Sequence, residues 1–349
     1  MTLKIEVREI STENKEWHEL VHSSRQNILF VDQRFLNIWT TKGTSNHLML
    51  LGCYDESGCL VGGQAIIHRK FMGLRIQGSF NISYRCTPIL AGHIRENSPE
   101  QYEILSALAR VTRKKFPYLK VEFHPNLTDT RAYLNNGWHA EPQYAHTWDL
   151  RNVDNILQNM HRKKRSYVRK ALETYEFNVE RDKKIIDEFL RLYTETMAKF
   201  SWCPNENWSE SFHHKANWLL DEKLLLPCTC RAKTGELISV ALVILSPENR
   251  TAYGWLIGYD HAYASYEIPA SLQYYSATIL AANFDVLDLG DGPNANLFAY
   301  KDSLGTASHP FWVLTTKDTK KWIKVLDFLR DTRQSLQKLF RQRIHAFDS

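Results

Sequence analysis

The sequence predicts an α/β (α+β) protein of two similar domains, each a mixed β-sheet flanked by helices. Three observations predict this fold class. The chain has 349 residues, a length typical of two domains. In both halves, segments with the period of strands alternate with segments with the period of helices. Each half also contains a hairpin, a strand, a helix and a strand in that order, which indicates a duplication. We expect domains at residues 1–151 and 152–349.

Composition and charge narrow the class of protein. Hydrophobic residues make up 43% and charged residues 24% of the chain, as in ordinary soluble globular proteins. The net charge of +5 suits an anionic substrate but is too small by itself to indicate nucleic acid. No run approaches the roughly 18 apolar residues of a membrane span, and residues 1–6 have the pattern of a strand rather than of a signal peptide. We therefore expect a cytoplasmic protein, at most peripheral to a membrane.

The first half begins with a strand and a helix and then forms a hairpin. Asp55, Ser57 and Gly58 are its turn signal, because Gly supplies a positive φ while Asp and Ser bond the local backbone. Gly137 indicates the end of a short helix. The expected strands span 3–9, 47–54, 60–69, 82–89, 119–124 and 144–149, and the expected helices span 12–23, 33–40, 100–115 and 130–135.

The second half repeats this order loosely. Ser209 is an expected N-cap, since its hydroxyl can accept from a backbone N–H. Pro269 lies near the first turn of another expected helix, and the segment from Gly292 to Lys301 is expected to be a polar loop. The expected helices span 153–160, 164–172, 184–200, 209–220, 269–282 and 322–340, and the expected strands span 177–180, 224–232, 237–245, 253–260, 285–289 and 312–315.

Neither the close cysteine pair nor the adjacent histidines form a metal pattern. Cys228 and Cys230 are the only close pair among six cysteines, and no second pair or suitably spaced histidine completes a zinc site around them. His213 and His214 are adjacent, so one helix cannot direct both at one ion. We therefore expect reduced structural cysteines and no metal cofactor.

The segment from Leu287 to Gly305 has the strongest features of a functional site. A short apolar strand runs into the turn Gly290-Asp291-Gly292, and a lysine follows an aromatic residue at Tyr300-Lys301. Glycine lets the backbone approach a ligand closely. We therefore expect a binding site where this strand ends.

Motifs across most of the chain resemble those of the Fem-type acyltransferases. They are a helix end at 133–138, a closing strand at 147–150, a basic helix at 160–172, Asp288-Leu-Gly290, Tyr300-Lys301 and Leu304-Gly305. This family is a twin-domain branch of the GNAT superfamily and includes aminoacyl-tRNA-dependent enzymes of peptidoglycan bridge synthesis. The resemblance implies two tandem GNAT-like domains, with the acyl-transfer site of the second domain in the cleft that faces the first.

Two departures from related enzymes bear on the acyl donor. The extended helical hairpin of some bridge-forming members is absent, so tRNA binding through it is not implied. The segment 261–268 contains no glycine, whereas ordinary GNAT enzymes hold the coenzyme A pyrophosphate on a Gly-rich loop at a helix N-terminus. The donor is therefore open between acyl-CoA and aminoacyl-tRNA.

The expected activity is N-acyl or N-aminoacyl transfer onto a primary amine, directly and without a covalent enzyme intermediate. The expected acceptor is an amino sugar, a cell-envelope precursor or a related metabolite. Two alternatives stay open: aminoacyl-tRNA-dependent peptidoglycan bridging, and a non-catalytic GNAT scaffold that binds an anionic glycan precursor.

Lys301, Asp288 and Asp291 are the candidate catalytic residues. Such a reaction needs a positive group for the developing oxyanion and an acceptor for the proton of the amine. Lys301 could stabilise the oxyanion or anchor a phosphate, or be a surface lysine beside Asp302. Asp288 or Asp291 could orient the amine or act as base, although Asp291 also suits a turn cap. Tyr300 could stack on substrate or belong to the core.

The remaining candidates are substrate-binding residues. Arg162, Arg165 and Arg169 share one helix face and could meet a diphosphate substrate, an RNA backbone or an anionic membrane, or only solvent. Trp202 lies in a loop, 202–208, that could line an acceptor pocket or simply join two helices. By the resemblance, Tyr84 and Arg85 lie where the family binds acceptor groups between domains.

Overall fold

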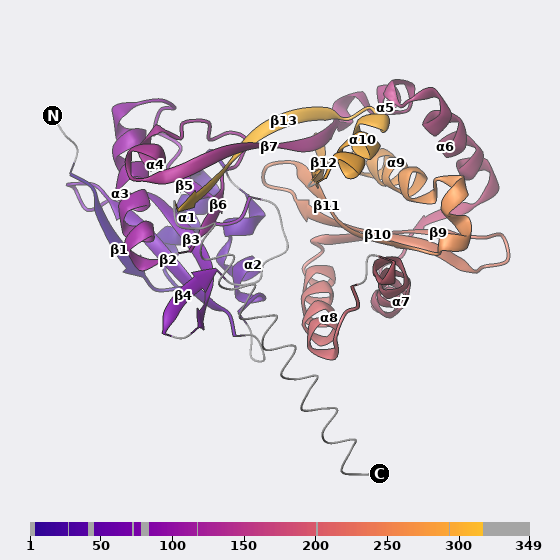
Figure 1. Ribbon diagram of the computed structural model, residues 1–349, viewed down its shortest axis with the longest axis horizontal. Coiled ribbons are helices and arrows are strands. Elements are labelled where there is room, and N and C mark those ends of the chain that lie inside the picture. The colour runs from indigo at the N-terminus through magenta and orange to yellow at the C-terminus, as the bar shows by residue number, and fades with distance from the viewer. Residues whose placement is uncertain are drawn as a thin grey trace, which may run out of the picture.

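The computed structural model describes residues 4–26, 28–40, 45–71, 73–77, 84–116, 118–199, 202–292 and 294–316. These residues form a mixed α/β structure with two β-sheets, which confirms the predicted fold class (Figure 1). Within this part of the chain, no helix is both long enough and apolar enough to span a membrane.

The first sheet is built on the predicted hairpin. Asp55 holds its turn, because its carboxylate accepts from the backbone N–H groups of Ser57 and Cys59, both at 2.9 Å. The strands are β1 (Glu6–Ile10), β2 (His47–Tyr54), β3 (Leu60–Phe71) and β4 (Leu74–Gln77) in this order, with β5 (Pro88–Leu90) paired to β3. The helices of this region are α1 (Lys15–Ser23), η1 (Leu29–Val31), α2 (Gln33–Asn37), α3 (Pro99–Lys115) and α4 (Arg131–Asn135).

The second sheet contains eight strands in the order β6-β13-β7-β12-β11-β10-β9-β8. Helices α7 and α8 lie on one side of β9 to β11, and α6 and α9 lie on the other (Figure 1). The strands are β6 (Lys120–Glu122), β7 (Trp138–Asp149), β8 (Glu176–Val179), β9 (Leu225–Arg231), β10 (Leu237–Ser246), β11 (Thr251–Tyr259), β12 (Val286–Asp291) and β13 (Ala307–Thr316). The helices are η2 (Leu150–Asn152), α5 (Val153–Asn159), α6 (Arg162–Thr174), α7 (Lys184–Ala198), α8 (Glu206–Asp221), η3 (His261–Tyr266), α9 (Ile268–Leu280) and α10 (Ala295–Ser303).

Strands from both halves of the chain share the second sheet. β13 pairs antiparallel with β7 along ten residues, from Ala307 opposite Thr147 to Thr316 opposite Trp138, and also pairs with β6. The two long strands run side by side across the top of Figure 1, between the two parts of the molecule. A single hydrophobic cluster extends from Trp17 in α1 to Phe189 in α7. The predicted boundary after residue 151 falls between β7 and α5 and stays a prediction.

β11 and β12 diverge at their carboxyl ends. Their parallel pairing runs from Thr251 opposite Val286 to Tyr253 opposite Asp288. Beyond these pairs β11 continues to Tyr259 and β12 continues to Asp291 without further registered partners between them. The sheet therefore opens at this point.

Local backbone preferences overturn three expectations from the sequence. The expected strand at 82–89 is wrong for its described residues before Pro88, because Tyr84 and Cys86 have left-handed backbones with φ of 56° and 55°. Asn205, not Ser209, caps α8, and its side chain accepts from the N–H of Trp208. Lys301 lies on helix α10 rather than after an extended loop. The expected helix at 322–340 lies outside the described residues.

Candidate active site

Two cavities meet where β12 ends. The first, of about 320 Å³, lies between the two halves and is lined among others by Phe30, Tyr84, Arg85, Glu122 and Asp291. The second, of about 520 Å³, lies where β11 and β12 diverge. Four residues line both cavities: Gly254, Trp255, Leu289 and Lys301. A group in one cavity can therefore approach a group in the other across Lys301.

Lys301 is a buried cation with a fixed position. Its side chain is on the last turn of α10, the end of a helix that favours positive charge. The ammonium donates to the backbone oxygens of Leu289 at 2.6 Å and Asp291 at 2.5 Å, and the residue is only 6% exposed. Burial lowers the pKa of Lys301, although Asp291 and Asp288 oppose this shift. Two of its three N–H groups are used by the backbone, which leaves one for a ligand.

The turn after β12 depends on a glycine for its backbone conformation. Gly290 has a φ of 77°, which side chains with a Cβ rarely adopt. A Cβ at this position would lie 3.8 Å from the Lys301 Nζ, an ordinary contact. The glycine is therefore required by its backbone angle rather than by crowding.

Asp288 is buried and bonded on both carboxylate oxygens. Oδ2 accepts from the Tyr84 hydroxyl at 2.6 Å, and Oδ1 accepts from the Gly290 N–H at 2.7 Å. Asp288 is 3% exposed, and burial raises its pKa against the lowering effect of these bonds. Burial also raises the pKa of Tyr84, with a further contribution from Asp288. Tyr84 lines the first cavity, whereas Asp288 does not. Asp288 is therefore connected to this cavity only by its hydrogen bond from the Tyr84 hydroxyl.

Arg85 and Glu122 form an ion pair in the wall of the first cavity. The Arg85 Nη2 lies 2.6 Å from the Glu122 Oε1, and the Lys120 Nζ lies 2.8 Å from the same oxygen. Burial alone would raise the pKa of Glu122, but the two cations outweigh it and hold the pKa below its usual value. The side chain of Asp291 is exposed at the same cavity. The first cavity thus carries both signs of charge.

The second cavity is apolar along its strands and polar near α9 and α10. Two buried side-chain atoms of its lining residues, Gln273 Oε1 and Tyr300 Oη, have no hydrogen-bond partner among the described residues. Lys164, on α6, lies 4.6 Å over the Tyr300 ring and 2.6 Å from Glu267. Buried polar atoms are usually hydrogen-bonded, so these two indicate a ligand with polar groups.

The three predicted arginines of α6 lie outside both cavities. Lys164, Val168 and Ala171 occupy the helix face that packs on the protein. Arg162 and Arg169 lie away from this face, and the half-buried Arg165 flanks it. Arg162 and Arg169 are exposed, while Arg165 donates to the Gln158 backbone oxygen at 2.7 Å. The arginine face is therefore open to a partner larger than either cavity.

Trp202 also lies outside the cavity linings. Its ring packs edge-on against Trp208 at 5.3 Å and Tyr193 at 6.1 Å, and it is 37% exposed. Tyr193, its neighbour, lines the second cavity. Any role of Trp202 in substrate binding is thus at the cavity mouth or through Tyr193.

The residues of the site that were missed from the sequence include Lys164, Glu267, Trp255 and Glu122. Glu122 has a recognisable signal, since it is a carboxylate between two apolar residues, Val121 and Phe123. Lys164 stands in a run of cations and nothing separates it from its neighbours. The roles of Glu267 and Trp255 depend on how β11, α9 and α10 come together, which no local pattern shows.

Comparison with known proteins identifies a domain that contains the candidate site. Residues 156–302 match the family model described as an acetyltransferase (GNAT) domain, and this range includes Asp288 and Lys301. Among solved structures, FemX is similar with a TM-score of 0.62 and 14% identity, over 88% of this chain and 96% of that one. A tandem GNAT protein from the clavulanic acid biosynthesis pathway gives 0.53 and 10%, over 89% and 98%. L-PGS from Bacillus licheniformis gives 0.52 and 12%, over 82% and 92%. No curated protein matches the chain.

Residues 156–302, with the divergent β11 and β12, match an acyltransferase domain of the GNAT superfamily, and the two joined cavities lie at this domain. The chain shares the fold of FemX and of the tandem GNAT protein along most of its length. The predicted resemblance and enzyme class are therefore confirmed.

Proposed function

We propose that the chain transfers an acyl group from a donor in the second cavity to a primary amine in the first. The observation that carries this proposal is that Lys301, a buried cation with one N–H to spare, lines both cavities. An acyl carbonyl at this junction would be in reach of the amine on one side and its own leaving group on the other. Preorganised positive charge at such a point stabilises an oxyanion.

The groups around Lys301 supply the rest of the reaction. The amine nitrogen attacks the acyl carbon, an N–C bond forms, and the C–S bond of a thioester or the C–O bond of an aminoacyl ester breaks. The proton of the amine passes to the Tyr84 oxygen while the Tyr84 hydroxyl proton passes to Asp288, whose raised pKa suits a proton acceptor. The leaving thiolate or alkoxide takes a proton from solvent. Asp291, at the rim, would accept a hydrogen bond from the incoming amine, which attacks as the neutral base after it has lost its extra proton to solvent.

The charges of the first cavity suggest an acceptor that carries both an amine and an anionic group. Glu122 and Asp291 suit the amine, and Arg85 suits a phosphate or carboxylate. An amino sugar, an envelope precursor or a related metabolite with such groups fits this description. All six cysteines, each within the described residues, are free thiols, as expected in the reducing cytoplasm, where we place the reaction.

Two donors remain in contention. The mostly apolar second cavity with its two unpartnered polar atoms suits the acyl arm of an acyl-CoA. One observation favours an aminoacyl-tRNA instead: the arginine face of α6 lies outside both cavities, where a nucleic-acid backbone could reach it. An anionic membrane surface would suit the same face. FemX and L-PGS share only the fold, so their names do not decide the donor.

The experiment that tests this proposal combines donors and acceptors directly. Purified protein is incubated with acyl-CoAs or with aminoacyl-tRNA, each with a panel of amino sugars and amine-bearing precursors, and amide formation is followed by mass spectrometry. Loss of product after ribonuclease treatment identifies the tRNA donor, and release of free thiol identifies acyl-CoA. If precursors bind but no pair of donor and acceptor gives product, the non-catalytic scaffold replaces this proposal.

A further inference from the structure

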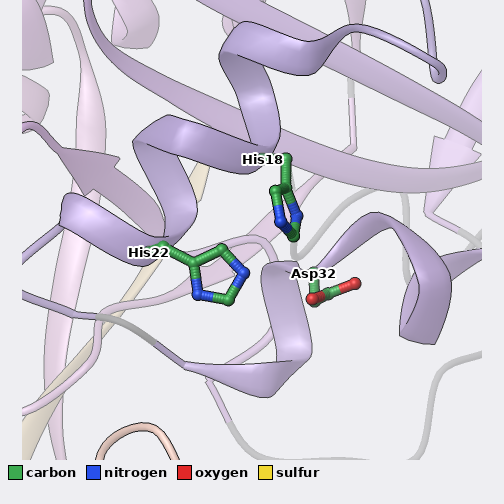
Figure 2. Close-up of side chains that lie close together, drawn as sticks. All are labelled: His18, His22 and Asp32. Carbon is green, nitrogen blue, oxygen red and sulfur yellow. The ribbon is translucent and has the colours of Figure 1, made fainter.

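Two histidines and an aspartate converge in the first half of the chain and line neither of the two cavities. His18 and His22 lie one turn apart on α1, and Asp32 caps the start of α2 (Figure 2). The two imidazole rings are 4.2 Å apart between centroids, at 75° to each other. One ligand atom from each of the three side chains lies within 4.8 Å of the others.

We propose that His18, His22 and Asp32 bind a divalent transition-metal ion such as Zn²⁺. Histidines at i and i+4 lie on one helix face and can share an ion. Two imidazole nitrogens and a carboxylate form a donor set that suits zinc and its neighbours rather than Ca²⁺ or Mg²⁺. Glu19 lines the same surface hollow as His18 and Asp32, so it or a water molecule can complete a tetrahedral site.

The side chains can reach the required geometry. Zinc–nitrogen bonds of about 2.0–2.1 Å require ligand atoms somewhat closer than 4.8 Å. His18 and His22 are both exposed, so their rings can turn inward without disturbing the core. The backbone positions are already fixed, because the Trp17 Nε1 donates to the Val31 backbone oxygen at 3.0 Å and ties α1 to η1.

Arg34 is the present partner of Asp32 and would be the competitor of the ion. The Asp32 Oδ1 caps the Arg34 N–H at 2.8 Å, while the Arg34 Nη2 lies 3.0 Å from Oδ2. The Arg34 side chain is 58% exposed but that of Asp32 is 6% exposed, and the pair is bidentate because the Arg34 Nε also donates to Oδ1 at 3.2 Å. An ion must therefore displace this pair. The ion can take Oδ2 while Oδ1 keeps the helix cap, and the guanidinium moves into solvent.

An ion at this site would affect the wall of the first cavity. Phe30 is two residues before Asp32, lines that cavity and packs on Tyr253 with ring centroids 4.6 Å apart. An ion bound between α1 and Asp32 would restrict the motion of the segment that carries Phe30. Metal binding itself is independent of the proposed acyl transfer, so its test does not rely on activity.

The test measures ion binding to tag-free protein after chelator treatment. A background with Cys59→Ser and Cys203→Ser removes the exposed thiols, which could otherwise bind zinc. Titration calorimetry with Zn²⁺ should show one site per chain. His18→Ala or His22→Ala should each weaken binding at least as much as loss of an outer-shell group does, about 10- to 100-fold. The matched control His214→Ala, another exposed histidine, should bind as the parent does.

Two further measurements make the result specific. Arg34→Gln should leave binding intact or strengthen it, because it removes the competing cation. Amide hydrogen exchange at residues 28–36 should slow on addition of Zn²⁺ in the parent but not in His22→Ala. Absence of a zinc site, or equal affinity in the parent and both histidine variants, would overturn the proposal.

Discussion

The Tyr84 hydroxyl lies 2.6 Å from the Asp288 Oδ2, a hydrogen bond between residues 204 positions apart. It joins the left-handed segment before β5 to the middle of β12, and so joins the two halves of the chain beside the first cavity. Because Asp288 is buried, this bond and the one from Gly290 determine how the carboxylate can receive a proton. The same hydrogen bond therefore links the two halves of the chain and forms the proposed path of the proton.

Tyr84→Phe should lower kcat strongly. The change removes the hydroxyl that relays the proton while the ring keeps its contacts with His124 and Phe311. Loss of a general base costs about 100- to 10,000-fold. The matched control is Tyr133→Phe, another buried tyrosine, whose hydroxyl donates to Gln64 away from both cavities. Equal kcat values for the two variants would exclude the relay.

Asp288→Asn should reduce activity and raise stability at neutral pH. The amide keeps an acceptor for the Gly290 N–H, and the Tyr84 hydroxyl can rotate to accept from it. Burial raises the pKa of Asp288 above its usual 3.8. The folded protein therefore binds the proton more tightly than the unfolded chain, and the unfolding free energy falls as pH rises between the two pKa values.

The measurement for this variant is the unfolding free energy at several pH values. The advantage of Asp288→Asn over the parent should be smallest near pH 4 and grow toward neutral pH, by about 1.4 kcal/mol for each unit of raised pKa. A difference that stays constant across this range would show that burial does not disfavour the carboxylate.

The sequence predicted well the features that depend on near neighbours. The hairpin of β2 and β3 follows from Asp55 and Gly58, whose side-chain bonds and backbone angle act within five residues. The position of Lys301 close to the end of β12 also follows from the short spacing between the Gly290 turn and Tyr300-Lys301. Turn residues and short spacings predicted the structure correctly where the tertiary contacts favoured the same conformation.

The missed features depend on distant partners. Nothing in the sequence near Ala307 shows that β13 will lie between β6 and β7. The partner of Asp288 comes from Tyr84, whose left-handed backbone also broke the expected strand there. The spacing of Arg162, Arg165 and Arg169 showed a common face, but only the packing of Val168 and Ala171 shows that this face points outward.

Arg165→Gln with Arg169→Gln should weaken productive binding of aminoacyl-tRNA, and more so at low salt. Arg169 is exposed and Arg165 is half-buried on α6, and neither side chain lines a cavity. Each lost phosphate contact should reduce the slope of log affinity against log salt by about 1. The control pair Arg110→Gln and Lys114→Gln removes the same charge from exposed positions on α3. If both pairs change the slope equally, the arginine face has no specific role.

The kinetics of Lys301 variants test the central claim most directly. If its ammonium stabilises charge that develops only in the transition state, Lys301→Ala should lower kcat about 100- to 1,000-fold and leave KM nearly unchanged. Lys301→Arg should restore part of the rate, since it keeps the charge but not the compact geometry. Lys184→Ala, an exposed lysine on α7, is the matched control, and thermal unfolding checks that each variant is folded. A rise in KM at constant kcat would instead make Lys301 a ground-state anchor, and wild-type kinetics in folded Lys301→Ala would contradict the account.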